Sequence, residues 1–132
     1  MEITETQGIE KRKILITAGL PYANGPIHLG HLMEYLQADF WSRFQRLRGH
    51  DCHYICAEDT HGTPIMVKAR EQNITPETLI GDWRTKHVND FADFQVQFAH
   101  YGSTNSVANQ KLCEEFYHAL NNKGQFNRRE ID

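Results

Sequence analysis

The sequence predicts an α/β fold built on a parallel sheet with flanking helices, and three observations support this class. Residues 13–18 are a short β-branched run typical of a buried strand, and residues 50–59 form a second strand-like segment that is apolar in its centre. Longer segments with apolar residues at helical spacing come after each run, and Gly- and Pro-rich turns separate them. Strands that alternate with helices in this way form parallel sheets.

The first strand and the first helix are joined by a turn rich in glycine and proline. The strand is "KILITA", residues 13–18, and the turn is "GLPYANGP". The spacing predicts a helix from about residue 27 to 48, stopped by Gly49. Its apolar residues are expected to face the sheet: Leu29, Leu32, Met33, Leu36, Phe40, Phe44 and Leu47.

The second strand leads into two helices. "HDCHYICAED", residues 50–59, is apolar in its centre, and Gly62 and Pro64 break the chain after it. A short helix is predicted over about 65–72. Another helix follows "NITPETL", where Thr75 is expected to be the N-cap because its hydroxyl can accept a backbone N–H.

The remaining sequence predicts a third strand at 94–102 and a last helix at about 106–122, which ends before Gly124. We expect residues 1–12, which are polar and charged, to be a flexible N-terminal segment. Residues 13–132 would then form one domain. The chain stops soon after an extended tail begins, which is typical of a truncated sequence.

Composition restricts the class of protein. The 132 residues carry a formal charge of −3, which argues against a basic module held to nucleic acid by phosphate contacts alone. Three cysteines without a dense framework suit a reducing compartment, and no apolar run could span a membrane. The sequence therefore predicts a cytoplasmic protein.

The motif "HLGH" at the start of the first helix is the strongest chemical signal. His28 and His31 are three residues apart, so they share one face of the first helical turn and can reach one ligand. Gly30 lies between them and lets a flat ring approach the backbone. A helix start after the first strand of an α/β sheet favours phosphate. The alternative is a pair of half-exposed capping histidines.

At these residues the sequence resembles a known family. "LPYANGPIHLGH" is similar to the first signature of class I aminoacyl-tRNA synthetases, and "AEDTHGTPI" makes the methionyl branch the better match. The resemblance covers the chain from Lys13 onward. It implies a Rossmann-like (HUP-type) fold, of which this chain would be the first half, cut before the connective zinc insertion and the second half of the catalytic domain.

The resemblance also implies roles for single residues. His28 and His31 would be catalytic and would bind the ATP phosphates, and Gly30 would make room for adenine. Methionine would be bound by Gly19, Leu20, Tyr22 and Asp59. Asn24 and His61 have less defined roles in the same site. Glu58 is not expected to be a ligand, because strand alternation turns it away from Asp59.

The implied activity is that of a methionine–tRNA ligase. Such an enzyme activates methionine with ATP and Mg²⁺ to methionyl-adenylate and pyrophosphate, and then transfers methionine to tRNA(Met). The nucleophile is already ionised, so catalysis needs positioning and stabilised phosphoryl charge rather than a general base. The second, lysine-rich signature K-M-S-K-S is absent here. The isolated chain is therefore expected to be inactive.

Three alternatives stay open at this point. The chain could belong to a nucleotidyltransferase with the same H-x-G-H layout, to a leucyl, valyl or isoleucyl synthetase, or to a non-catalytic nucleotide-binding module. Cys52 and Cys56 are expected to be core thiols, and no metal site is predicted in this chain. Zinc would belong to the downstream insertion, and the oligomeric state is not predicted.

Overall fold

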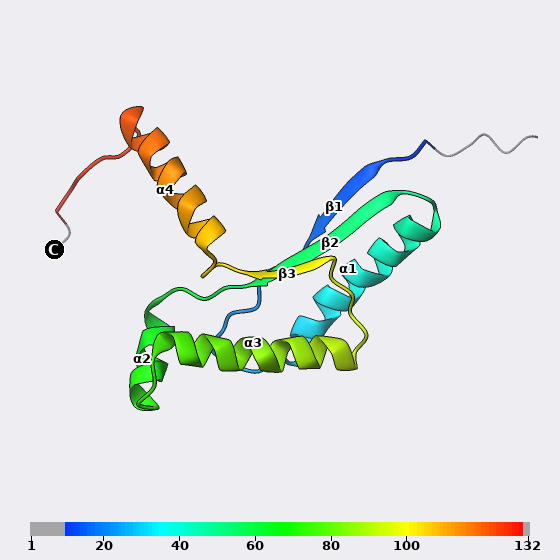
Figure 1. The fold of residues 1–132 in the computed structure, drawn as a ribbon, viewed down its shortest axis with the longest axis horizontal. Coiled ribbons are helices and arrows are strands. Elements are labelled where there is room, and N and C mark those ends of the chain that lie inside the picture. Colours follow the sequence, from blue (N-terminus) through cyan, green and yellow to red (C-terminus); the bar gives the residue numbers. More distant parts are fainter. Residues whose placement is uncertain (1–9, 131–132) are drawn as a thin grey trace, which may run out of the picture.

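The computed structural model describes residues 10–130, so most of the predicted flexible segment 1–12 lies outside the described residues. Three parallel strands form the sheet in the order β1-β2-β3 (Figure 1). They are β1 (Lys13–Thr17), β2 (Asp51–Glu58) and β3 (His100–Ser103). The alternation of strands and helices thus gives the parallel sheet that the sequence predicts.

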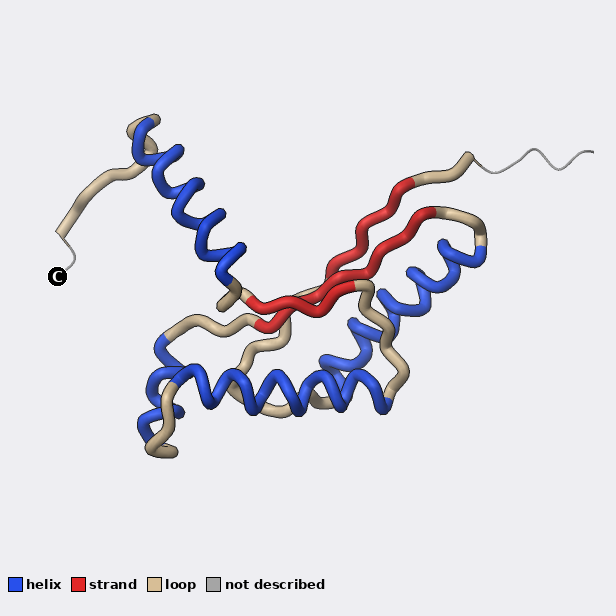
Figure 2. Tube along the Cα trace, viewed as in Figure 1, coloured by secondary structure: helices blue, strands red, loops and turns tan. Residues whose placement is uncertain are grey.

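Helices α1 (Leu29–Leu47) and α3 (Pro76–Asp93) lie on the same side of this sheet (Figures 1 and 2). The main core is formed between them and the sheet. It contains Leu32, Tyr35, Tyr54, Cys56, Phe91 and Val96. Both crossovers run in the same direction across the sheet, which places their helices on one face.

The other two helices lie at the margins of this core. Helix α2 (Thr63–Glu71) packs on α3 through a second cluster, which contains Ala23, Ile65, Ala69 and Leu79. Helix α4 (Val107–Asn122) projects away from the layer of α1 and α3 and buries none of its side chains (Figure 1).

Helix α1 packs only in part through the face that its apolar residues predict, since Leu32 and Leu36 contribute to the main core and the other predicted residues do not. Its buried residues are Leu32, Tyr35, Asp39, Ser42 and Gln45. Met33, Phe40 and Leu47 are instead 59%, 62% and 87% exposed. Asp39 is buried with partners, since it accepts from the Gln97 amide at 3.0 Å and pairs with Arg43. The expectation was wrong for the exposed residues, because side-chain polarity does not decide burial once such partners exist.

Two further boundaries differ from the predictions. The third strand was expected from residue 94, but α3 runs to Asp93, Phe94 is its C-cap and Gln95 has a positive φ of 58°. Only the end of the predicted strand pairs with β2. Helix α2 begins at Thr63, because Pro64 lies in its first turn, where a missing N–H costs nothing, rather than breaking the chain before it.

The N-cap of α3 agrees with the sequence. Thr75 accepts from the Thr78 amide at 3.2 Å as the predicted N-cap of α3, and Ser106 caps α4 in the same way.

Between residues 10 and 130, every helix is too short or too polar to cross a bilayer.

Candidate functional site

The turn between β1 and α1 is fastened to the carboxyl end of β2. The Ala23 amide donates to the Asp59 carbonyl and the Asp59 amide to the Pro21 carbonyl, both at 2.9 Å. This bridge continues the parallel sheet beyond the strands and places Tyr22 beside Asp59. Gly62 has a φ of 125°, and a Cβ there would lie 2.8 Å from the Tyr22 hydroxyl. Glycine at 62 therefore lets Tyr22 take this position.

A hollow of about 260 Å³ opens beside this turn. Tyr22, Asn24, His31 and His87 contribute to its lining, together with Pro21 and residues 25–27. The hollow lies at the carboxyl ends of the strands and at the start of α1, which is the usual binding position in an open parallel sheet.

His28 and His31 cap the first turn of α1. The Nδ1 atom of His28 accepts from the amides of Gly30 at 3.1 Å and His31 at 3.4 Å. The Nδ1 atom of His31 accepts from the His28 amide at 3.4 Å, which completes a reciprocal capping box. Their rings are stacked with centroids 3.7 Å apart.

This capping box fixes which ring nitrogen carries the proton. A backbone N–H can only donate, so both Nδ1 atoms are acceptors and the protons reside on Nε2. Both side chains are exposed, which leaves two Nε2–H donors at a helix N-terminus. Gly30 leaves room for this arrangement, because a Cβ there would lie 3.0 Å from the His28 ring and would press on it. The capping interpretation and the ligand interpretation of the motif are thus compatible.

The structure brings Asp59 to the same edge of the sheet. Its carboxylate forms none of the hydrogen bonds or ion pairs found among residues 10–130. Gly19 lies next to α1, where its amide donates to Glu34 at 2.5 Å and its carbonyl accepts from the Tyr35 hydroxyl at 2.9 Å. Leu20 is 44% exposed. Neither Gly19 nor Leu20 lines the hollow.

The two less defined candidates lie differently. Asn24 lines the hollow, and its carbonyl accepts from the Lys68 ammonium of α2. His61 does not line it; its Nε2 atom is 3.1 Å from the carbonyl of Thr104, in the loop before α4. The structure thus groups Tyr22, Asn24 and His31 around one hollow and leaves His61 outside it.

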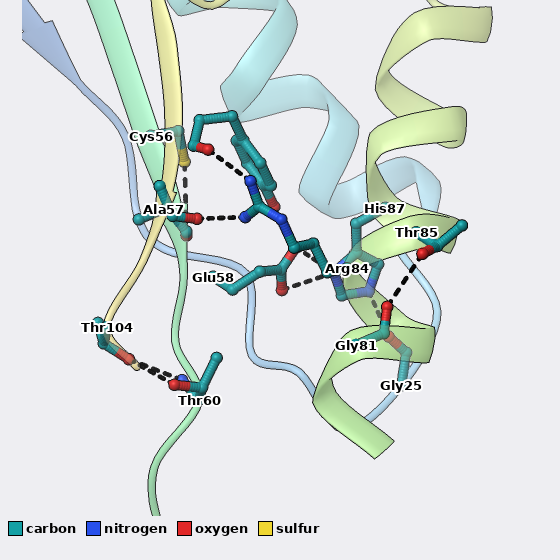
Figure 3. A network of polar contacts seen from close by, with 12 residues as sticks. Gly25, Cys56, Ala57, Glu58, Thr60, Gly81, Arg84, Thr85, His87 and Thr104 are labelled. Atoms are coloured by element: carbon teal, nitrogen blue, oxygen red, sulfur yellow. Dashed lines mark hydrogen bonds and ion pairs between the residues drawn. The ribbon is translucent and has the colours of Figure 1, made fainter. Parts of the chain in front are cut away.

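A buried polar network beneath the turn was not predicted from the sequence. The Nδ1 atom of His87 lies 3.0 and 3.1 Å from the two carboxylate oxygens of Glu58, and both side chains are almost fully buried. The His87 Nε2–H donates to the Gly25 carbonyl at 2.7 Å (Figure 3). The Tyr101 hydroxyl donates to Glu58. Glu58 is thus bonded inside the core rather than available to a ligand. The sequence offered one signal, because His87 takes a core position four residues from both Trp83 and Phe91.

The network changes the ionisation of its members. Burial alone lowers the pKa of His87, but the hydrogen bonds to Glu58 and Gly25 and the negative charges of Glu58 and Asp90 outweigh it and raise the pKa. Both ring nitrogens donate, which is the arrangement of an imidazolium. Burial and the bond to Glu58 raise the pKa of the Tyr101 hydroxyl, so it stays a donor.

The cysteines of β2 lie apart from this chemistry. Cys52 and Cys56 are free buried thiols on the α1 side of the sheet, as strand alternation predicts. Burial raises the pKa of Cys56 to about 11, which keeps it protonated. Within the described part of the chain, no group of three or more His, Cys, Asp or Glu side chains could hold a metal ion.

Solved structures resemble this fold over most of the chain. A crystal structure of a LeuRS–tRNA–LeuAMS ternary complex from Agrobacterium radiobacter matches 87% of this chain and 15% of its own, with a TM-score of 0.80 and 21% identity. The Mycobacterium tuberculosis methionyl-tRNA synthetase in complex with methionyl-adenylate matches 86% of this chain and 22% of its own, with a TM-score of 0.80 and 22% identity. At these identities the likeness shows the fold, and it confirms the Rossmann-like class.

Sequence comparison assigns the family. A Bdellovibrio bacteriovorus protein named methionine–tRNA ligase is 71% identical over 108 residues, which are 82% of this chain. The chain spans only 16% of that relative's length. The family model described as "tRNA synthetases class I (M)" matches residues 14–132. The chain therefore belongs to the M family of class I tRNA synthetases.

Proposed function

We propose that the protein containing this chain is a methionine–tRNA ligase that forms methionyl-adenylate and transfers methionine to tRNA(Met). The observation that carries the proposal is the stacked pair His28–His31, with two exposed Nε2–H donors at the start of α1. Its support is the 71% identity to a protein of that name.

In the first step, a carboxylate oxygen of methionine attacks the α-phosphorus of ATP. The new O–P bond forms as the bond to the β-phosphate oxygen breaks, and pyrophosphate leaves. His28 and His31 would donate to the phosphoryl oxygens, where negative charge builds up. Donors that are already oriented by the capping box need no reorganisation during the step, which is how such groups lower a barrier.

Asp59 would bind the methionine ammonium, since its carboxylate has no partner among the described residues and lies beside Tyr22. Gly19, Leu20 and Tyr22 would form part of the wall around the methionine, and Gly30 would let adenine approach the helix. Of the two further candidates, we assign Asn24 to the site because it lines the hollow, whereas His61 is bonded to Thr104.

Metal ions enter this proposal only as Mg²⁺ supplied with the ATP. The described residues do not offer the ligand cluster that a structural zinc ion needs, so no step here uses zinc. We place the reaction in the cytoplasm, where a reducing environment suits the free thiols.

The test is methionine-dependent exchange of pyrophosphate into ATP by the intact protein that contains this chain. We expect exchange with methionine but not with leucine, isoleucine or valine. Exchange with leucine alone would assign another synthetase, and no exchange with any amino acid would favour a nucleotidyltransferase or a binding module. The 132-residue chain alone should bind ATP weakly without turnover, and exchange by that chain would contradict this expectation.

A further inference from the structure

Residues 25–27, which directly precede His28, form few hydrogen bonds to the rest of the protein. Among the described residues, backbone–backbone hydrogen bonds fix the turn as far as Asn24 and begin again at His28, the N-cap of α1. Residues 25–27 form none of them. Pro26 has no N–H to offer. The position of the His28–His31 pair therefore depends on side chains that contact this segment.

His87 supplies the hydrogen bond that holds this segment, in addition to the packing of Ile27 against the main core. Its Nε2–H donates to the Gly25 carbonyl at 2.7 Å, three residues before His28 (Figure 3). The other ring nitrogen is anchored by both oxygens of Glu58, at the end of β2. The imidazole thus links the central strand to the turn, and it lines the same hollow as His31.

The anchor is built to be rigid. His87 is 1% exposed and Glu58 is fully buried, so neither side chain can change rotamer without displacing the core. Tyr101 bonds Glu58 from β3, and Arg84 of α3 donates to the Tyr101 carbonyl at 2.7 Å. A buried ion pair is poor evidence for stability alone, because its desolvation offsets much of its attraction. Its geometric effect on the turn is the more direct one.

We propose that His87 is a positioning residue for the adenylation reaction. By holding the Gly25 carbonyl, His87 fixes residues 25–27 and so sets where His28 and His31 meet the nucleotide. The inference rests on the proposed function, because it concerns the same site. His87 itself need not contact the substrate. Its effect should appear in kcat rather than in the affinity for methionine, since methionine is assigned to Asp59 and the residues around it.

Two amide substitutions separate this role from a merely structural one. In His87→Gln the side-chain amide reaches the position of Nε2 and can still donate to Gly25. In His87→Asn the shorter amide takes the position of Nδ1, so it can meet Glu58 but not Gly25. Both variants remove the charge, so a purely structural effect should be similar in the two.

The measurement is methionine-dependent pyrophosphate exchange by the intact protein, with melting temperatures for each variant. We expect His87→Asn to lower kcat roughly tenfold to a hundredfold, because small misplacements of catalytic groups cost that much. KM for methionine should stay near the wild-type value, and His87→Gln should restore most of kcat. Equal kcat for the two variants, or a change confined to KM, would overturn the proposal.

A matched control comes from the other end of β2. His53 lies 2.9 Å from Asp51 in an exposed pair that does not contact the turn, so His53→Gln should leave exchange unchanged. A wild-type protein without methionine-dependent exchange would refute the proposed function instead. These two failures are distinguished by the wild-type assay.

A second measurement covers the case in which His87→Asn does not fold. In wild-type protein labelled with ¹⁵N-histidine, the Nε2–H of His87 should give a slowly exchanging resonance, because it is buried and bonded. Addition of ATP should shift this resonance and leave that of His53 unchanged. If the His87 resonance does not respond to ATP, the segment is not coupled to the nucleotide and the proposal fails.

Discussion

Two groups of ionisable side chains meet at the turn formed by residues 21–27, and they differ in how their polar atoms are used. His28, His31 and Asp59 are exposed or half-buried, with two ring N–H groups and a carboxylate that have no partner among residues 10–130. Glu58 and His87 are buried and fully bonded. The first group is available to a ligand, whereas the second is committed to the protein.

This difference separates two kinds of functional residue. Unpaired donors and acceptors at the end of a parallel sheet gain their partners only when substrate binds, so their removal should change rates and Michaelis constants. Buried, paired groups are already bonded to other protein groups in the folded state. Removing such a group should therefore change the free energy of unfolding and the geometry of the site. The predictions below test whether the two groups behave in these two ways.

The largest effect is expected from His28→Asn. Asparagine is a favoured N-cap, so the helix start should be kept while the ring Nε2–H is lost. We expect kcat for methionine-dependent exchange by the intact protein to fall roughly 10²- to 10³-fold, the usual effect of removing a preorganised donor. The melting temperature should stay close to wild type. If activity survives above a tenth of the wild-type rate, the role assigned to His28 is wrong.

A smaller effect is expected from Asp59→Asn, which removes the charge without changing the size of the side chain. A hydrogen bond to a charged group contributes about 1.5–3 kcal/mol, so KM for methionine should rise roughly tenfold to a hundredfold. Asp51→Asn at the opposite end of β2 is the control, since Asp51 pairs with exposed His53. Similar KM values for these two variants would contradict the assignment of Asp59.

The smallest effect is a pH dependence of stability that comes from the buried group. The folded protein raises the pKa of His87, against burial, through Glu58 and the Gly25 carbonyl. The contribution of His87 to the free energy of unfolding is therefore complete below the pKa of about 6.5 that histidine has in the unfolded chain. This contribution is lost as the pH rises through the pKa of His87 in the folded protein. One such group changes the free energy of unfolding by at most about 1.4 kcal/mol per pH unit.

This dependence can be measured as the difference in melting temperature between wild type and Glu58→Gln from about pH 6 to pH 9. The variant lacks the carboxylate that raises the pKa of His87, so the difference should be largest at low pH and should narrow as the pH rises. A difference that stays constant or widens with pH would contradict a raised pKa of His87 in the folded protein.

The order of strands and helices could be predicted because it is written in local signals. A β-branched run marks β1 and an apolar centre marks β2, while the predicted cap at Thr75 marks the start of α3. The packing face of α1 could not be predicted in this way. Its apolar majority lies away from the core, and Asp39 is buried because Arg43 and the Gln97 amide meet it there.

The residues of the candidate site also differ in whether local sequence signals could identify them. His28, Gly30 and His31 could be found because their spacing within one helical turn has a direct chemical meaning. His87 and Glu58 are 29 positions apart, and only the fold brings them together. The sequence indicates that His87 takes a core position of α3, but it does not indicate that Glu58 is its partner.

The capping role of His28 has a consequence for motion. The amides of Gly30 and His31 are protected from solvent by the His28 ring, so hydrogen exchange at these two positions should report opening of the first turn of α1. Any ligand that binds the rings through Nε2 holds them in the capping geometry. Occupancy of the site should therefore slow this local fraying. Hydrogen exchange at the amides of Gly30 and His31 would then report whether a ligand is bound.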